Sequence, residues 1–338
     1  MARNLQQTKV ANRLAMAGKK LMRDRIELPA ARMMVERWEQ VRDEIIAHAR
    51  GVWEREHGAE SPLHAQVARD KIATFMDEHL KRFRNETVEI LNTAKVQAYE
   101  QQYLIDNWVL DQVTPPNVTV KPKRNPAQYQ PAGGFHHKIG LKEAWWEEPP
   151  EGTPNTDPDT GAPVASGEQR VDGYLKAWEA VALAGVGLGA LQGDSPEDID
   201  ARVSGATAAG VNVQAAIDRI IKTEVQISVA DADESFMEDF EELLKRDESV
   251  WVTMDDERVC DICRSQEGKT QDEAEYTMPA HPKCRCWWRV KALDYKQLAG
   301  ALSVPGVSPE SMIFRDPQTG KARGAVVVNF DAWAQSIR

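Results

Sequence analysis

The chain has 338 residues, of which 42% are hydrophobic and 28% are charged, as is typical of a soluble globular protein. Its formal net charge of −11 argues against a protein that coats nucleic acid over its whole surface. The length predicts about two domains and allows at least one large hydrophobic core.

The first 25 residues are basic, with seven Lys or Arg side chains and one acid, Asp24. Such an arm suits contact with phosphate or with an acidic partner, and a solvated helix face or a flexible terminus is the simpler interpretation. No apolar core with a small-residue cleavage site is present, so we expect no secretory signal.

No run of about 18 uncharged apolar residues predicts a membrane-spanning helix. The best candidate, Ala180 to Leu191, is too short and is rich in glycine. We therefore expect a chain that is made and kept in a reducing cytoplasm. There, cysteines favour metal ligation over disulfides.

Two long helices are predicted in the first third of the chain. From residue 29 to about residue 56, and again from about residue 64 to residue 113, apolar side chains recur at helical steps of three and four. The two stripes comprise Met34, Trp38, Val41, Ile45, Ala49 and Val52, and then Ile72, Met76, Leu80, Phe83, Leu91, Ala94 and Ala98. Long helices with short connections are typical of an extended hairpin or bundle. We expect Trp38, Trp53 and Trp108 to serve packing.

The composition changes sharply between residues 114 and 167. Prolines and glycines recur through this segment and exclude continuous helix or a central strand. We expect a long arm or insertion, partly extended, that becomes ordered against a partner surface. The adjacent His136 and His137 would point to opposite sides of an extended chain, so we interpret them as surface residues rather than ligands.

Helical patterns resume at about Asp172. The segment Gly185-Val186-Gly187-Leu188-Gly189 lacks the spacing and the preceding strand of a dinucleotide-binding loop. Small residues that let two helices approach closely, or a helix end, are the better explanation for these glycines.

A helix start is predicted at Ser195. This residue suits an N-cap, Pro196 suits the first helical position, and Asp198 occupies the place of a capping-box acid. A further helix is predicted from about residue 213 to residue 244, with a break or bend near residues 230–233.

Two short strands are predicted on either side of the cysteine-rich segment. Residues 249–253 lead into the first pair of cysteines, and residues 286–290 leave the second pair. Trp287 and Trp288 would then point to opposite faces, with one ring in the core and the other on a surface available to a partner. A hairpin is also predicted in the tail, at residues 311–329.

These patterns predict an α+β, mostly α-helical fold: a long helical hairpin or bundle plus a small β module with a Cys/His knuckle. The regions that we expect are 1–113 (long helices), 114–171 (Pro/Gly-rich arm or insertion), 172–248 (a second helical part), 249–293 (β module) and 294–338 (tail with a hairpin).

All four cysteines of the chain lie between residues 260 and 286. Cys260 and Cys263 form a C-x2-C pair, and Cys284 and Cys286 close a second knuckle that also contains His281. Clustered thiolates with a histidine are typical zinc ligands, and a metal can replace the core that so short a segment cannot build. Any four of these five groups would complete a tetrahedral site. Metal-free thiols are the alternative.

We expect a structural zinc rather than a catalytic one. A catalytic zinc keeps an open coordination position and needs a nearby general base. Glu257, Asp261 and Glu267 are close in sequence, but no H-E-x-x-H pattern organises them. The sequence therefore predicts no catalytic residues and no enzyme.

A specific order of motifs surrounds the cysteines. A strand at Trp251 leads into Asp256-Glu257-Arg258-Val259-Cys260-Asp261-Ile262-Cys263, a Glu267-Gly268 turn follows, and His281-Pro282-Lys283-Cys284-Arg285-Cys286 closes the segment. Upstream lies the helical motif Arg219-Ile220-Ile221-Lys222-Thr223-Glu224.

In this order the motifs resemble those of the phage Mu F-like minor head proteins, the phage head morphogenesis family, over about residues 175–292. The family's helix motif usually reads Arg-Thr-Glu, and Lys222 stands where arginine is common. The resemblance implies structural roles for Arg219, Thr223, Glu224 and Trp251.

The resemblance also implies a function and a location. It predicts a structural minor head protein of a tailed bacteriophage that acts in head morphogenesis, with a part in DNA packaging or ejection. The implied partners are the portal protein, the major capsid protein and packaged DNA, with several copies on the portal. The implied location is the capsid interior or portal region of the virion, after assembly in the host cytoplasm.

Several charged residues near the motifs have two interpretations each. Arg219 and Glu224 form either a buried polar link to the knuckle module or a weak surface pair. Arg285 and Arg289 flank the knuckle and either contact DNA phosphate or pair with neighbouring acids.

Two other classes of function remain open from the residues. A zinc-ribbon protein that binds nucleic acid would need a contiguous basic face and binding that weakens steeply with salt, and the overall acidity argues against it. A phage-carried enzyme or toxin would need a pocket with a perturbed acid or base, for which the sequence offers no spacing.

Overall fold

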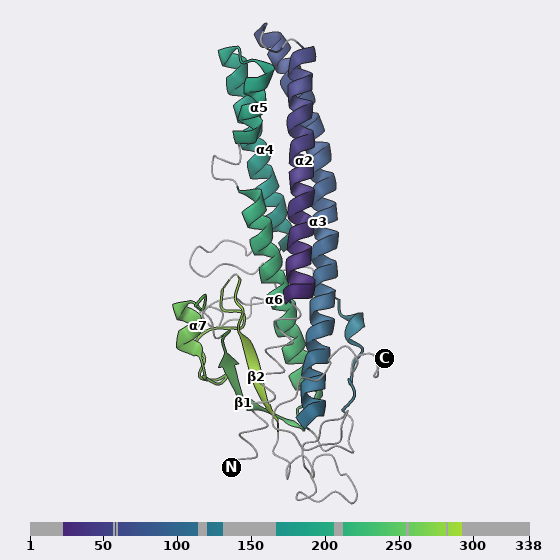
Figure 1. The fold of residues 1–338 in the computed structure, drawn as a ribbon, viewed down its shortest axis with the longest axis vertical. Coiled ribbons are helices and arrows are strands. Elements are labelled where there is room, and N and C mark those ends of the chain that lie inside the picture. The colour runs from purple at the N-terminus through teal and green to yellow at the C-terminus, as the bar shows by residue number, and fades with distance from the viewer. Residues whose placement is uncertain are drawn as a thin grey trace, which may run out of the picture.

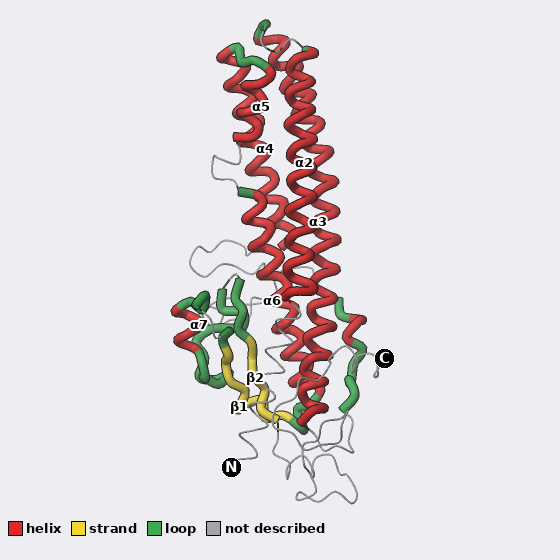
Figure 2. The backbone as a smooth tube through the Cα atoms, viewed as in Figure 1, coloured by secondary structure: helices red, strands yellow, loops and turns green. Residues whose placement is uncertain are grey.

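The structure, a computed structural model, describes residues 23–56, 58, 60–113, 120–130, 167–205, 212–254, 257–281 and 283–292. Within these ranges the chain is mostly helical and has one two-stranded antiparallel sheet, which confirms the expected α+β, mostly α-helical fold class. The helices form an elongated bundle, and a small β module lies against the lower half of it (Figure 1). Strands and ordered loops gather in that module, whereas the bundle is almost wholly helical (Figure 2).

Two long helices form the predicted hairpin. Helix α2 (Leu28–Arg55) continues a short π-helical turn at Arg23–Glu27, and α3 (Pro62–Val113) runs back along it. Every residue of the two predicted apolar stripes is buried, which confirms both helices and their inward faces. The connection requires glycine at Gly58, because a Cβ atom there would lie 2.5 Å from the ring of Trp53.

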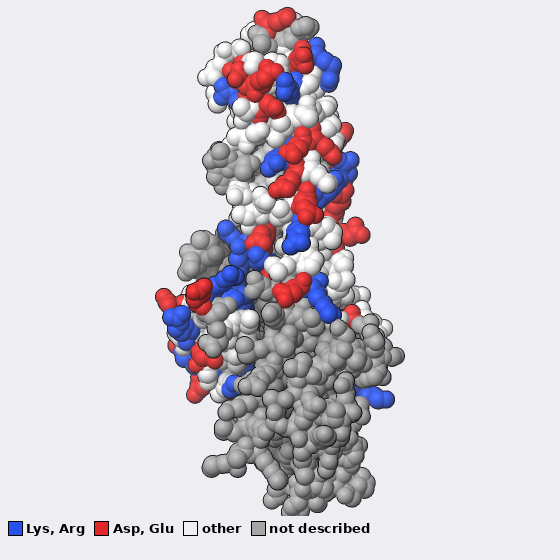
Figure 3. Space-filling model, in the orientation of Figure 1, with Lys and Arg blue, Asp and Glu red and all other residues white. Residues whose placement is uncertain are grey.

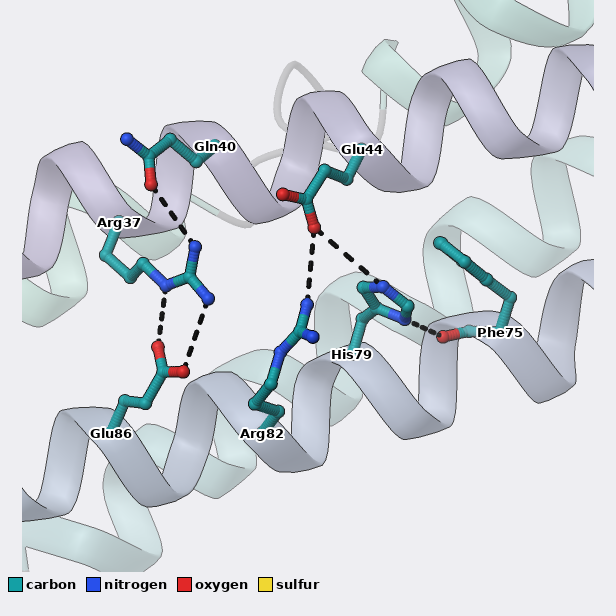
Figure 4. A network of polar contacts seen from close by, with 7 residues as sticks. All are labelled: Arg37, Gln40, Glu44, Phe75, His79, Arg82 and Glu86. Carbon is teal, nitrogen blue, oxygen red and sulfur yellow. Dashed lines mark hydrogen bonds and ion pairs between the residues drawn. The ribbon is translucent and has the colours of Figure 1, made fainter.

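Ion pairs connect α2 with α3 on the outside of the bundle (Figure 4). Arg37 Nε lies 2.6 Å from Glu86 Oε2, and this hydrogen bond lowers the pKa of Glu86. Arg82 and His79 both approach the carboxylate of Glu44. Such exposed pairs contribute at most about 1 kcal/mol each, so the buried stripes supply most of the stability of the hairpin.

Three further helices complete the bundle: α4 (Gly167–Gln192), α5 (Pro196–Gly205) and α6 (Val213–Asp239). Helix α4 begins earlier than the residue 172 that the sequence pattern indicates. In the centre of the bundle the Trp38 ring lies 5.5 Å from the Phe83 ring and 5.1 Å from the Trp178 ring. Buried residues from all five helices form one continuous core cluster.

The glycines of α4 allow close helix packing, as predicted. A Cβ atom at Gly189 would lie 2.5 Å from Ile199 Cδ1 of α5, and one at Gly185 would lie 3.3 Å from Arg202. A Cβ atom at Gly187 would meet nothing within 4 Å. Two of the three glycines therefore lie where α5 approaches α4.

The predicted capping box at the start of α5 is confirmed. Asp198 N donates to Ser195 Oγ at 3.2 Å, and Ser195 N donates to Asp198 Oδ2 at 3.2 Å. Both bonds pair backbone N–H groups that the first helical turn would otherwise leave unpaired.

The predicted break in the last bundle helix is wrong. Helix α6 is continuous through residues 230–233 and ends at Asp239 rather than near residue 244. Asp231 accepts a hydrogen bond from the Tyr129 hydroxyl at 2.6 Å, and the buried Asp233 accepts one from Gln102 Nε2 at 2.7 Å. Because both acids find side-chain partners from other segments, the helix passes through the bundle without interruption.

Part of the predicted Pro-rich arm is described, at residues 120–130. It contains a short 3-10 helix (Pro126–Gln128) and lies along α3 and α6. The Tyr129 ring stacks on the Tyr99 ring at 3.8 Å, and Arg124 Nε donates to Asp239 Oδ2 at 2.6 Å. The surface that orders this part of the arm is therefore the chain's own bundle.

Several predictions concern residues outside the described ranges. These are most of the basic N-terminal arm, the remainder of the Pro-rich arm with His136 and His137, and the tail hairpin at residues 311–329.

One described helix is long and apolar enough to cross a membrane by length and composition, namely α4 over Gln169–Gln192. It exceeds the shorter run that the sequence pattern indicates, because residues on both sides continue the helix. Its Trp178, Ala182 and Val186 are buried against the bundle, and 28% of the apolar window is buried. Length and composition are therefore weak evidence for a membrane segment here.

Candidate metal centre in the β module

The β module is built on two antiparallel strands, β1 (Leu244–Val252) and β2 (Trp287–Ala292). Val250 pairs with Arg289, and Trp251 pairs with Trp288. Strand β1 begins earlier than predicted. Leu244 and Lys245 also pair with β2, on the far side of an irregularity between Lys245 and Val250.

The two strands carry three buried tryptophans. Trp251 and Trp288 meet edge to face, with ring centroids 5.3 Å apart. Trp287 and Trp288 are both buried, so the prediction that one of them lies on an accessible surface is wrong. Helix α6 lies beside the start of β2, where Gln226 Nε2 donates a hydrogen bond to the Cys286 carbonyl.

The first cysteine pair lies at the start of a short helix, α7 (Asp261–Gln266). Cys260 is its N-cap, and its carbonyl accepts a hydrogen bond from Arg264 N at 2.9 Å. Cys263 N donates to Cys260 Sγ at 3.4 Å. The turn therefore places both sulfurs on the same side of the chain.

The second knuckle is a tight turn that precedes β2. Cys284 N donates to the His281 carbonyl at 3.1 Å, and Lys283 has a left-handed backbone with φ of 63°. This turn directs the histidine ring and the Cys284 sulfur towards the first pair.

The structure brings all five predicted donors together. His281 Nε2 lies 3.1 Å from Cys260 Sγ and 3.0 Å from Cys263 Sγ, and Cys263 Sγ lies 3.8 Å from Cys284 Sγ. Cys260, Cys263 and His281 form one group with donor atoms within 4.8 Å of one another, and Cys263, Cys284 and Cys286 form a second. Cys263 belongs to both groups.

The close approach of the sulfurs changes their acidity. Hydrogen bonds with Cys284 and then Cys286, together with burial, raise the pKa of Cys263. Hydrogen bonds from Cys263 and Cys286 lower the pKa of Cys284. One thiolate is thus stabilised by its neighbours, and further ionisation in this buried space needs a cation.

This arrangement can hold a metal ion. The cysteines are free rather than disulfide-bonded, and three of the five donor residues are buried: Cys263, Cys284 and Cys286. Among the described residues, neither donor group includes a carboxylate that would serve as a general base. The chemistry that such a donor set supports is metal binding.

The helix motif of α6 contacts the second knuckle directly. Lys283 N donates to Thr223 Oγ1 at 3.3 Å, and Gln226 Nε2 donates to the Cys286 carbonyl at 3.1 Å. Sequence reasoning missed Gln226, whose only signal is a polar side chain inside an apolar run of a buried helix. Thr223 and Gln226 therefore position the loop that carries His281 and Cys284.

Glu224 does not pair with Arg219, so both interpretations of that pair are wrong. The Glu224 carboxylate is buried and lies 3.0 Å from Lys95 Nζ of α3 and 2.7 Å from an Arg170 nitrogen of α4. Five residues along a helix turn the side chain by about 140°, which directs Arg219 to the exposed face instead.

Basic side chains gather where α6 meets the β module, whereas acids and bases alternate along the rest of the visible bundle (Figure 3). The exposed or half-exposed basic residues of α6 and the second knuckle are Arg219, Lys222, Lys283 and Arg285. Asp218 lies among them and pairs with Lys222 and Lys283, which reduces the local positive charge.

Comparisons of the chain with models of protein families, with curated proteins and with solved structures found no match. Its function therefore has to be inferred from its own residues and geometry.

Proposed function

We propose that the chain is a structural minor head protein of a tailed bacteriophage. In this role it associates with the portal or the capsid interior and acts in head morphogenesis. We further propose that its Cys/His cluster holds a structural zinc ion that joins the two cysteine turns of the β module.

One observation carries the proposal. The motifs that resemble the phage head family are separated by up to 60 positions, and they meet in one packed unit. Thr223 of the helix motif binds the backbone of Lys283 in the histidine knuckle, and Trp251 of the strand motif packs on Trp288. Motifs that assemble into one unit are expected of a shared fold, and not of chance similarity in separate segments.

The shape of the molecule agrees with an architectural role. The bundle extends well beyond the module, with a surface of mixed charge (Figures 1 and 3). A rigid rod with a compact module at one side suits a protein that connects neighbouring subunits of an assembly.

Zinc is the metal that the donor set fits best. Thiolates and imidazole are the ligands of structural zinc sites, whereas calcium and magnesium need several oxygen ligands. The zinc would be bound by four of Cys260, Cys263, His281, Cys284 and Cys286.

Metal analysis of the purified full chain tests the zinc site. We expect about one zinc per chain and its loss in Cys263→Ser, because Cys263 belongs to both donor groups. A protein without stoichiometric zinc, whose thermal stability is unchanged by Cys263→Ser, would contradict the zinc site.

Co-assembly tests the head-protein proposal separately. The chain would be produced together with the portal and major capsid proteins from the same genome. We expect it to co-purify with portal oligomers and to enter procapsids that contain portal. If the procapsids lack the chain and the chain forms no complex with portal, these results would argue against the head-protein proposal, whatever the metal content of the chain.

A second candidate function is binding of nucleic acid, which the basic residues at the junction of α6 and the module favour. It predicts binding to free duplex DNA that weakens steeply between low and high salt, and that falls in a Lys283→Gln variant. Portal binding without DNA binding would leave the structural role as the better account.

A further inference from the structure

We infer that the outward face of α4 is an interface between two copies of the chain, in which this helix packs against its equivalent in antiparallel orientation. The face has three properties that support this pairing: it is apolar, its two halves are complementary in shape, and the charges at its two ends are opposite. Such a dimer goes beyond the head-protein proposal and does not depend on the zinc site.

The outward face of α4 is apolar over about four turns. The chain has no charged residue from position 180 to position 192, and only 28% of the most apolar window of this helix is buried. The large residues of the face are Leu188, which is 50% exposed, and Leu191, which is 84% exposed. With them the exposed Ala177, Ala180 and Ala184 recur at steps of three and four.

The helices beside α4 differ from it in this respect. The outer faces of α2 and α3 carry ion pairs, such as those from Arg37 to Glu86 and from Arg82 to Glu44 (Figure 4). An uncharged apolar stripe on the outside of a charged bundle is typical of a surface that another molecule covers.

The two halves of the stripe are complementary in shape. Alanines line the half nearer the start of the helix, and the two leucines project from the half nearer its end. When two copies of the helix are antiparallel with Ala184 opposite Ala184, Leu188 faces the partner's Ala180, and Leu191 faces the partner's Ala177. Each leucine then fills the space above an alanine, and the small central residues let the two helices approach closely.

The charges at the two ends of the stripe are opposite. Lys176, whose side chain is 71% exposed, lies before the first alanine, and its pair with Asp172 is a weak exposed contact between neighbouring turns. The turn beyond the leucines is acidic, with four acids and one base between residues 192 and 202. In the antiparallel pair, Lys176 of each copy lies beside this acidic end of the other. A cation there also compensates the end of a helix whose last turn contains no basic residue.

A helix of a second copy fits this stripe better than a lipid bilayer does. Alanine buries little apolar surface in lipid, whereas small residues favour close contact between helices. The contact is about 21 Å long and is smaller than the standard interface of about 800 Å² per partner. The dimer is therefore weak in dilute solution and forms where copies are concentrated, as they would be on a shared oligomer.

Sedimentation velocity of the full chain at a series of concentrations tests the dimer. We expect a monomer at low concentration and a dimer at high concentration. Ala184→Glu places two like charges opposite each other and should raise the dissociation constant more than about tenfold. Ala215→Glu makes the same change at an exposed alanine of α6 and should dimerise as the wild type does.

A wild-type chain that is monomeric at every concentration overturns the interface. So does a dimer with the same dissociation constant in Ala184→Glu as in the wild type. Far-ultraviolet circular dichroism confirms that both glutamate variants keep their helices. Co-purification with portal protein decides the head-protein proposal independently of these results.

Disulfide crosslinking tests the antiparallel orientation. Ala180→Cys and Leu188→Cys would be prepared as separate variants, with the parent chain and its four native cysteines as the background control. A mixture of the two variants should form a mixed disulfide, because Leu188 faces the partner's Ala180. Disulfides within each variant alone, without the mixed product, would mean that the helices are parallel and would contradict the pairing.

Flotation with vesicles of phosphatidylcholine and phosphatidylglycerol tests the bilayer as the other occupant of the stripe. We expect the wild type to remain in the dense fraction. A monomeric wild type that floats with the vesicles, together with an Ala184→Glu variant that does not, would assign the stripe to a membrane surface and overturn the dimer.

Discussion

Glu224 is a buried carboxylate on which three helices converge. Its side chain is 4% exposed, and its two cationic partners, Lys95 and Arg170, come from α3 and α4. Burial lowers the pKa of Arg170, against the opposing effect of the Glu224 charge. An acid in this position stabilises the bundle only while both cations remain in place.

Replacing Glu224 by Gln should destabilise the fold by about 3–5 kcal/mol, because it leaves Lys95 and Arg170 without the negative charge that compensates them. Urea unfolding followed by circular dichroism measures the change. Glu197→Gln is the matched control, since Glu197 pairs with Arg50 at 2.6 Å in an exposed position and should lose less than about 1 kcal/mol. Equal losses of unfolding free energy in the two variants would show that the burial of Glu224 does not determine how much it stabilises the fold.

At the scale of single residues, local spacing predicted the donors but not their partners. Cys260, Cys263, His281, Cys284 and Cys286 were predicted from spacing alone, and the structure brings them together. The partners of Glu224 and the role of Gln226 depend on residues 54 or more positions away. A pattern read along one helix does not contain such contacts.

The glycines of α4 provide a comparison within one helix. Gly187→Ala should stabilise the protein by about 0.5–1 kcal/mol, because alanine favours helix and its Cβ atom meets nothing within 4 Å. Gly189→Ala should destabilise it despite the same gain. Its Cβ atom would lie 2.5 Å from Ile199 Cδ1, and overpacking costs about 1–3 kcal/mol.

Thermal unfolding of the two variants measures the difference. A Gly189→Ala protein as stable as Gly187→Ala would show that α5 can move away from α4 at no cost, and that the glycine is not needed for packing.

His48 gives the hairpin a dependence on pH. Its ring stacks on Phe75 at 3.6 Å, and burial, followed by the charges of Arg55 and His79, lowers its pKa. The folded state therefore favours neutral His48. This contribution to stability is complete above the ordinary histidine pKa of about 6.5 and is lost as the pH falls from there towards the lower pKa of the folded state.

As the pH falls below about 6.5, the free energy of unfolding of the wild type should thus decrease more steeply than that of His48→Gln. Urea titrations at several pH values measure both slopes. Equal slopes would mean that protonation of His48 has no part in the acid sensitivity of the fold.

At the scale of elements, apolar periodicity predicted what packs inward. The stripes of α2 and α3 were correct residue by residue, because one face of each helix is buried along nearly its full length. The predicted break in α6 was wrong because Tyr129 and Gln102 satisfy its acids from elsewhere in the chain. The early start of β1 was missed because the irregular pairing between Lys245 and Val250 interrupts the alternation of apolar and polar residues that identifies a strand.

At the scale of the whole molecule, the sequence predicted a helical bundle and a cysteine module but not how they join. The polar contacts of the junction include hydrogen bonds of the Thr223 and Gln226 side chains with the module backbone, and an ion pair between Lys283 and Asp218. Each of these contacts ends on the second knuckle, at Lys283 or Cys286. The position of the module on α6 therefore depends on the turn that the proposed zinc ion would hold in place.

Removal of zinc should therefore release the module and leave the bundle folded. Structural zinc supplies about 10–16 kcal/mol in small metal-dependent domains, which is more than so small a sheet can replace. The core of α2 to α6, by contrast, is continuous without the module. Chelation should abolish the near-ultraviolet signal of Trp251, Trp287 and Trp288, while most of the helical far-ultraviolet signal remains.

Cys263→Ser is the control for chelation, since a variant that binds no zinc should already show the altered tryptophan signal and should not respond to chelator. Loss of helix together with the tryptophan signal would mean that the bundle depends on the module as much as the module depends on the bundle. In that case zinc would stabilise the entire molecule. An architectural protein with a detachable module would then be excluded, because the two parts would unfold as one cooperative unit.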